Sequence, residues 1–462
     1  MNINTPLFNA RNSLSKGVNT NERELSSMIS STEFEKATYR KVTLRLMPFL
    51  FLCYTFSYIS RVNVGFAKLQ MQTDLRYFTD TVYGIGAGIF FIGYFLFEVP
   101  SNMIMRRIGA RALIAPVMII WGLLSASTMF AYTSTTFYIL RFTLGIIESG
   151  FFPGVILYLT FWYTAKHRAK MTGYFMSAMA LSSAFGGAVS GWILQEMTTS
   201  GSLRAWQWLF MIEALPAIFA GFSAYFVLSD KPSEAMWLTQ DEKDLLSRRL
   251  DEEEAAKAAK GVTQHKFSDA FRSKKVWAFC FVYLGIISGN YGLTFWLPQI
   301  IKDNITTNYW YIGLVSMVPW GISAIAMIWY GHHSDQTGER RWHLAVAALL
   351  SAAGFAVAAI PRLSPVESIA AITVAAIGFM STFSCFWAIP AEILSGAAAA
   401  AGIAWINSIG NLGGYLAPSM IGKLRDMTGN RMTIPFLVLS FLCLAASVVV
   451  LYVTRRRPVP AD

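Results

Sequence analysis

The chain has 462 residues, of which 54% are hydrophobic, 15% aromatic and only 14% charged, and its formal net charge is +11. A single water-soluble core does not accommodate so much apolar sequence, so we expect the lipid bilayer to be its solvent. In a soluble protein this charge would suggest nucleic acid, but in a membrane protein its distribution matters more, and no nucleic-acid partner is expected.

Residues 1–45 are polar and lack the apolar stretch of a signal peptide, so the first hydrophobic segment is expected to be an uncleaved anchor. Roughly 20 apolar residues cross a bilayer as a helix. The sequence contains twelve such segments, at 46–66, 82–104, 112–131, 135–161, 169–194, 207–228, 276–298, 311–331, 343–361, 366–390, 394–421 and 432–454. This pattern predicts an all-α polytopic membrane protein.

Positive charge gathers on one side of these segments. With an even number of spans, 28 of the 38 Lys and Arg lie on the side of the termini, eight lie on the other side and two lie within spans. The positive-inside rule makes the first side cytoplasmic. We therefore expect a protein of the bacterial inner membrane with both termini in the cytoplasm.

The segments divide into two sets of six that share short motifs. Asn102-x-x-x-Arg106 follows span 2, and Gly331-x-x-x-Asp335 follows span 8, 229 residues later. Repeats of this kind indicate two pseudo-symmetric six-helix bundles. The expected parts are a cytoplasmic tail (1–45), an N-terminal bundle (46–228), a cytoplasmic linker (229–275) with a solvated helix, a C-terminal bundle (276–454) and a second tail (455–462).

Seven stretches carry more specific motifs: YISRVNVGFAKLQM, FEVPSN with IGAR, LRFTLGIIESGFFPG, DKPSEAMWLTQDEK, FWLPQI, GHHSDQTGERR and LSGAAAAAGIAWINSIGNLGGYLAP. In this order they resemble the major facilitator superfamily, and specifically its anion:cation symporter family, over nearly all of residues 40–455. The resemblance implies two bundles around a central cavity, alternating access, and proton-driven uptake of carboxylates such as sugar acids, tartrate, phthalate or hydroxyphenylacetate. The chain departs from the family at Ser60, where an acidic residue usually precedes the arginine.

Arg61 lies near the end of the apolar run MPFLFLCYTFSYISRVNVGFA. A charge at the bilayer centre costs at least ~2.5–3.5 kcal/mol on insertion scales, so such a group usually faces a cavity or a partner. Arginine stays protonated and can fork two hydrogen bonds to a carboxylate. We therefore interpret Arg61 as the anion anchor of a cavity. The alternatives are a structural ion pair and a side chain that reaches the outer interface.

Arg141 and Glu148 are seven residues apart in span 4 and share a helix face. The resemblance implies that they form the family's functional pair. Since a bound anion partly cancels nearby arginines, substrate occupancy and protonation of Glu148 are expected to couple. Glu148 is thus the candidate proton carrier and Arg141 a candidate substrate ligand. A purely structural Arg–Glu pair is the alternative.

Further cavity residues are implied by the resemblance, which assigns Tyr94, Trp387 and Asn407 to substrate binding. Simple helix packing is the alternative for Tyr94. Asn290 lies 229 residues after Arg61 and is therefore its duplicated counterpart, where an amide would complete the site. Neutral donors opposite an arginine-bearing half would orient hydroxyls or a ring.

The stretch after span 8 resembles the superfamily's gating motif, with Asp335, Gly338, Arg340 and Arg341 as its carriers. The copy after span 2 has Arg106 where that motif usually has an aspartate.

Glu98 and Glu213 lie near predicted span ends and are interpreted as interfacial or packing residues. No metal-ligand spacing or nucleophile arrangement appears in the sequence, so a proton is the only coupling ion expected and no cofactor is predicted.

The sequence thus predicts a secondary active transporter that imports a small organic carboxylate by proton symport and works as a monomer. An anion exchanger or facilitator without proton coupling is the main alternative, and Ser60 favours it. A membrane receptor that uses the same cavity without turnover is the second alternative. A membrane-embedded enzyme is disfavoured, because no buried nucleophile–base or metal set is visible.

Overall fold

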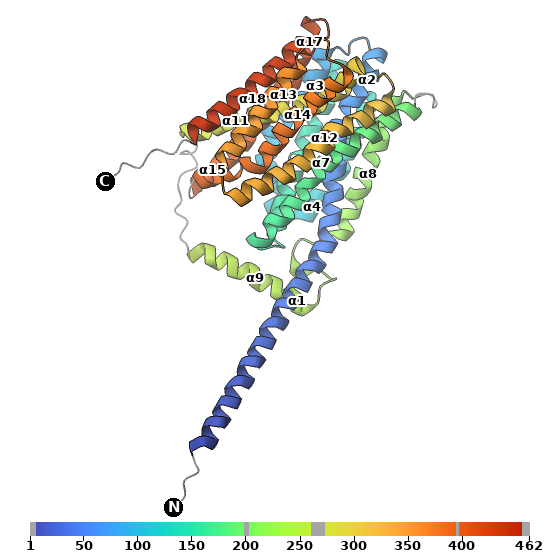
Figure 1. Ribbon diagram of the computed structural model, residues 1–462. Coiled ribbons are helices and arrows are strands. Elements are labelled where there is room, and N and C mark those ends of the chain that lie inside the picture. Colours follow the sequence, from blue (N-terminus) through green and yellow to red (C-terminus); the bar gives the residue numbers. More distant parts are fainter. Residues whose placement is uncertain (1–5, 198–202, 260–272, 394–396, 455–462) are drawn as a thin grey trace, which may run out of the picture.

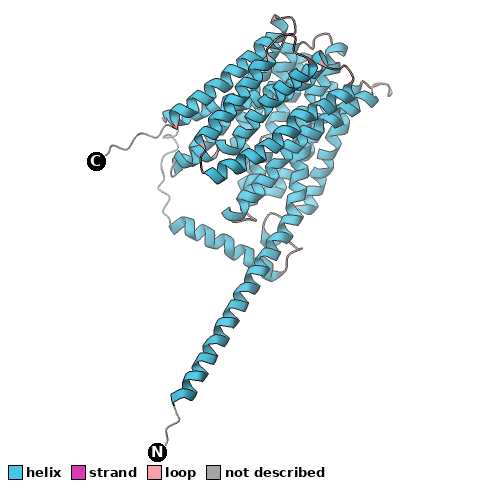
Figure 2. Ribbon diagram, viewed as in Figure 1, coloured by secondary structure: helices cyan, strands magenta, loops and turns pink. Residues whose placement is uncertain are grey.

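The computed structural model describes residues 6–197, 203–259, 273–393 and 397–454, which form helices and the turns between them. Figure 1 shows the helices running side by side as one bundle, with the N-terminal part of α1 (Pro6–Val62) projecting far beyond it. Within the described residues there are helices and loops but no strands (Figure 2). The predicted all-α polytopic fold is therefore confirmed.

Apolar runs form these helices, and polar residues set where several of them begin. The Thr79 hydroxyl accepts the backbone N–H of Val82 at the start of α3, and Ser364 forms a capping box with Glu367 at the start of α14. Such caps satisfy N–H groups that have no partner inside the helix.

The N-half consists of the helices before the linker. They are α1 (Pro6–Val62), α2 (Val64–Asp74), α3 (Asp80–Ile108), α4 (Ala110–Ser127), η1 (Thr128–Phe130), α5 (Ser134–Glu148), α6 (Phe151–Thr160), α7 (Ala165–Glu196) and α8 (Ala205–Val227). The linker holds η3 (Pro232–Glu234) and α9 (Gln240–Ala259). The C-half consists of α11 (Lys274–Asn304), α12 (Tyr309–Thr337), α13 (Arg341–Ala358), α14 (Pro365–Phe386), α15 (Ala388–Ile393), α16 (Ala397–Asn411), α17 (Gly413–Met427) and α18 (Thr433–Val453).

Two predicted spans are corrected. Eleven helical stretches among the described residues are long and apolar enough to cross a membrane, and the first runs over Glu33–Asp74, well beyond the predicted 46–66. The predicted span 394–421 corresponds to two 15-residue helices, α16 and α17, which are divided at Leu412, and neither helix alone is long enough to count among the eleven. Residues 394–396 lie outside the described part. The predicted tail and first span also form one helix, since α1 passes through residue 45 unbroken.

The two halves meet through pairs of helices that the duplication relates to each other. α3 packs on α17, and α7 packs on α12, while α2 packs on α11. Where α7 crosses α12, a Cβ on Gly313 would lie 2.5 Å from the carbonyl oxygen of Gly187. Small residues at such crossings let membrane helices approach closely, so these glycines set the distance between the halves.

The linker helix α9 docks on the N-half, on the side toward which α1 projects (Figure 1). Lys41 of α1 bonds Glu242 at 2.7 Å, and Arg249 bonds Glu35 at 2.6 Å. The helix predicted in the linker is confirmed, but it is attached to α1 and not solvated on all sides. We call this end of the bundle the α9 end, and the opposite end the far end.

Candidate functional site

A cavity of about 110 Å³ lies between the two halves. Its wall is mostly aromatic, and it includes Tyr54, Phe91, Tyr94, Tyr283, Tyr291 and Trp387. Its polar wall includes Arg61 from the N-half and Asn290, Asn407 and Asn411 from the C-half. The structure thus brings together five of the six predicted substrate residues, namely Arg61, Tyr94, Asn290, Trp387 and Asn407.

Glu148 lies directly behind Arg61 and is only 1% exposed. Its Oε1 accepts hydrogen bonds from Nε of Arg61 at 3.1 Å, from Nη2 of Arg61 and from the Ser57 hydroxyl at 2.8 Å. Its Oε2 is buried and has no hydrogen-bond partner among the described residues. One oxygen of the carboxylate is therefore saturated with donors, and the other is open to a proton.

Arg61 is held on several sides. Its Nη1 donates to the hydroxyl of Tyr291 on α11 at 3.1 Å, and its Cζ lies 5.1 Å from the centre of the Phe90 ring and 5.8 Å from that of Tyr94. A guanidinium has five N–H donors, and three of them are used in these bonds. Two N–H groups of Arg61 therefore stay available to a ligand in the cavity.

Arg141 lies behind the site and does not line the cavity. It is 1% exposed, and it donates long hydrogen bonds of 3.4 Å to the carbonyl oxygens of Gly86 and Arg61. The Arg61 carbonyl is in the last turn of α1, where backbone carbonyls have no partner inside the helix. In this structure Arg141 therefore fixes the backbone that carries Arg61, and Glu148 pairs with Arg61 instead of with Arg141.

The C-half supplies amides and rings. Asn290 is 2% exposed, and its Oδ1 has no hydrogen-bond partner among the described residues. Asn407 donates to Oε1 of Glu98 at 3.1 Å, a bond that joins α16 to α3. Trp387 packs edge-on against Tyr283 at 4.9 Å between ring centres. Glu98, interpreted from the sequence as interfacial or packing, thus links the two halves.

The far end is closed by a cluster of four buried or half-buried charges that we call the far-end cluster: Lys68, Asp80, Asp303 and Arg425. Asp80 bonds Lys68 at 2.8 Å and Arg425 at 2.7 Å, and Arg425 also bonds Asp303 at 3.0 Å. Lys68 and Asp80 belong to the N-half, and Asp303 and Arg425 belong to the C-half. Of the three ion pairs, the one between Asp80 and Arg425 therefore ties the two halves together.

The predicted gating residues lie in one turn at the α9 end. Asp335 bonds Arg340 at 2.6 Å, Gly338 has a left-handed φ of 65° that suits glycine, and Arg341 donates to the carbonyl of Leu451 at 2.8 Å. Both contacts stay within the C-half. In the N-half copy of the gating motif, Asp230 accepts a hydrogen bond from the backbone N–H of Arg111 at 2.8 Å. A carboxylate from another segment therefore caps the turn that carries this copy.

Sequence reasoning missed Tyr291 and the far-end cluster. Tyr291 directly follows Asn290, and the duplication that selected Asn290 was the only signal toward it. Lys68 and Arg425 lie outside the predicted spans, and no sequence pattern shows that they come together with Asp80 and Asp303. Glu213, expected near an interface, is 5% exposed and accepts a hydrogen bond from Ser190 at 2.7 Å.

Comparisons with known proteins identify the family and the fold. The model of the Major Facilitator Superfamily matches residues 50–418. A protein of Agrobacterium vitis named "Putative tartrate transporter" is 44% identical over 93% of this chain and 94% of its own length. The "Inner membrane transport protein RhmT" of Escherichia coli (strain K12) is 38% identical over 86% of this chain and 91% of its own. The solved inward open conformation of the xylose transporter XylE from E. coli has a TM-score of 0.68 at 16% identity, and covers 90% of this chain and 97% of its own.

Proposed function

The chain belongs to the Major Facilitator Superfamily, and we propose that this transporter imports a small hydroxylated organic carboxylate together with protons. The observation that carries the proposal is the arrangement of Arg61 and Glu148. Arg61 lines the cavity with two N–H groups that have no acceptor among the described residues, and the carboxylate of Glu148 behind it has one oxygen without a hydrogen-bond partner there.

Arg61 is the proposed anion anchor. Its guanidinium is buried among aromatic rings, where charge-assisted hydrogen bonds to a carboxylate are strong because little water competes. Arg61, Arg141 and Glu148 are buried at the site, and they sum to one positive charge when all are ionised. An anion that enters the cavity restores neutrality, which favours carboxylates over neutral or cationic compounds.

Glu148 is the proposed proton carrier. A bound carboxylate cancels part of the positive field that Arg61 and Arg141 exert on Glu148, and a proton can bind Oε2 of Glu148 without disturbing the three donors on Oε1. Binding of substrate and uptake of a proton therefore favour each other, and by linkage this effect is reciprocal. No cofactor is needed for this cycle, since the proton is the coupling ion.

The proposed substrate is a hydroxy acid such as tartrate. The amides of Asn290, Asn407 and Asn411 line the wall opposite Arg61, and amides both donate to and accept from hydroxyl groups. The unpartnered Oδ1 of Asn290 is a buried acceptor in need of a donor. The name of the Agrobacterium vitis relative supports the same choice. An aromatic acid is the alternative that the ring-lined wall would also accept.

A second candidate function is anion exchange without proton coupling. It is favoured by Ser60, whose hydroxyl bonds the carbonyl oxygen of Phe56 at 2.9 Å and brings no second carboxylate to Arg61. In both functions we place the protein in a bacterial inner membrane with the α9 end in the cytoplasm, as the charge distribution favours. We expect a functional monomer whose partners are the lipid bilayer and the small carboxylate.

The test is uptake of radiolabelled tartrate, phthalate and 4-hydroxyphenylacetate by the purified protein in liposomes. Proton symport predicts accumulation above the outside concentration only when the outside is more acidic. Exchange predicts uptake that needs an internal carboxylate and ignores the pH gradient. If none of the three acids is taken up or exchanged, the substrate class is wrong.

A further inference from the structure

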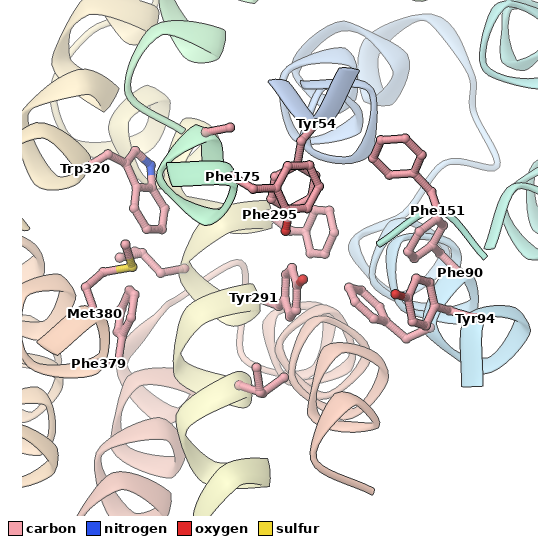
Figure 3. Close-up of a cluster of buried hydrophobic side chains, with 14 of the residues drawn as sticks. Tyr54, Phe90, Tyr94, Phe151, Phe175, Tyr291, Phe295, Trp320, Phe379 and Met380 are labelled. Carbon is pink, nitrogen blue, oxygen red and sulfur yellow. The ribbon is translucent and has the colours of Figure 1, made fainter. Parts of the chain in front are cut away.

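Tyr291 lies on the C-half side of the cavity, opposite Arg61 and next to the predicted ligand Asn290. It is 6% exposed and lines the cavity. Its ring packs between Phe91, at 4.4 Å between ring centres, and Phe295, at 5.9 Å. Figure 3 shows Tyr291 near the centre of the close-up, with its hydroxyl on the side of Tyr94. This packing holds the phenol at a fixed place in the wall.

The hydroxyl of Tyr291 acts as a hydrogen-bond acceptor but not as a donor among the described residues. Its oxygen accepts a hydrogen bond from Nη1 of Arg61 at 3.1 Å, and its own O–H has no acceptor among the described residues. A phenol is both a donor and an acceptor. The O–H donor of Tyr291 and the free N–H groups of Arg61 therefore lie next to each other, at the place where the two halves touch within the cavity.

We infer that Tyr291, from the half opposite Arg61, is a second ligand of the substrate carboxylate. This inference rests on the proposed function. One carboxylate oxygen accepts from a free N–H of Arg61, and the other accepts from the O–H of Tyr291. The Arg61–Tyr291 hydrogen bond does not need to break for this, since it uses the phenol oxygen as acceptor. The substrate carboxylate then bridges the N-half and the C-half.

This bridge gives Tyr291 a role in specificity. A carboxylate offers two acceptor oxygens to the two donors, whereas a carboxamide offers one acceptor and an NH₂ group that faces a donor without bonding it. An unsatisfied buried donor carries a large desolvation cost. Tyr291 therefore sharpens the choice of acid over amide, beyond what the charge of Arg61 provides.

The test compares Tyr291→Phe with Tyr283→Phe. Tyr283 lines the same cavity from the same helix, and no hydrogen bond joins it to Arg61 among the described residues. Equilibrium binding to the purified protein is measured for tartrate, phthalate and 4-hydroxyphenylacetate, and for their carboxamides. We expect Tyr291→Phe to raise the Kd for the acids roughly ten- to a hundredfold, the loss of one hydrogen bond to a charged group, and to reduce the acid-over-amide ratio. Tyr283→Phe should leave that ratio unchanged.

The acid-over-amide ratio is independent of the fraction of folded protein, so partial misfolding of the variant does not mimic the result. Acid binding that is unchanged or tighter in Tyr291→Phe overturns the role of Tyr291 and leaves the proposed function standing. A wild-type protein that binds none of the acids overturns both. An equal loss of acid and amide binding would mean that Tyr291 only packs the wall.

Discussion

The far-end cluster and the cavity site are both sets of buried charges, but they differ in balance. The far-end cluster has two cations and two anions, drawn from both halves, and each carboxylate contacts at least one cation. The cavity site has two cations, Arg61 and Arg141, and one anion, Glu148, all from the N-half. In a set with equal numbers of cations and anions the charges neutralise one another, so no net charge is left to attract a ligand. An unbalanced set stays ready for an anion.

The difference also bears on alternating access. In the proposed cycle the far end opens, so the Asp80–Arg425 pair, which joins the two halves, must break once in each cycle. Breaking such a pair has a high free-energy cost while the charges remain buried, and this cost falls when water enters as the helices separate. The Arg61–Glu148 pair lies within one half and does not need to break when the halves rock. It changes instead by gaining a ligand and a proton.

The largest expected effect is at the far end. Asp80→Asn leaves Lys68 and Arg425 facing a single carboxylate, and removing one partner of a buried pair costs about 3–5 kcal/mol. We expect a marked fall in thermal stability, measured by unfolding in detergent, and increased labelling of a cysteine placed at the far end. The charge-balanced double variant Asp80→Asn/Lys68→Met should recover part of the loss. A double variant less stable than Asp80→Asn would contradict the role of charge balance.

The next effect is at the anchor. Arg61→Lys keeps the charge but loses the planar fork, because a compact ammonium cannot reproduce its geometry. Loss of charge-assisted hydrogen bonds of ~1.5–3 kcal/mol each predicts at least a tenfold fall in uptake of tartrate by liposomes. Arg45→Lys, exposed on the same helix, is the matched control. Wild-type uptake by Arg61→Lys at equal protein density would remove Arg61 from the binding site.

The sequence context reveals some residues of this site and gives no sign of others. Arg61 stands out because a charge inside an apolar run has few structural uses, and Glu148 follows from helical spacing with Arg141 together with the family resemblance. The partner of Glu148 was not predictable, since Arg61 and Glu148 are 87 residues apart and only the tertiary fold brings their side chains together. The spans were predictable from hydropathy, except where the break at Leu412 divides one.

A third prediction tests whether the proton belongs to the cavity site. Glu148→Gln mimics the protonated carboxyl, so the variant should bind tartrate and exchange it across the membrane. Accumulation driven by the pH gradient should fall to equality of the inside and outside concentrations. Glu196→Gln, exposed at the end of α7, is the control. If Glu148→Gln accumulates substrate with the pH dependence of wild type, the exchanger becomes the better function.

The smallest effect is expected at an ion pair that is neither deep in the bundle nor between the halves. Glu242 on α9 bonds Lys41 of α1, whose side chain is 42% exposed. Burial raises the pKa of Glu242, but the Lys41 ammonium and the backbone N–H of Thr239 lower it by more, so its pKa lies below the ordinary 4.5. Such a group adds stability above pH 4.5 that is lost as the pH falls through its lowered pKa.

Exposed pairs typically contribute about 0.2–1 kcal/mol, because water screens them and two long side chains lose freedom. Glu242→Gln should therefore increase hydrogen exchange of α9 by no more than about fivefold at pH 7. Glu254→Gln, exposed on the same helix, is the control and should have no effect. Acidification to below the lowered pKa of Glu242 should remove the difference between Glu242→Gln and wild type, since Glu242 is then protonated in both the attached and the detached helix. A difference that persists at low pH would assign the attachment of α9 to Arg249 and Glu35 instead, whose bond at 2.6 Å is the other link to α1.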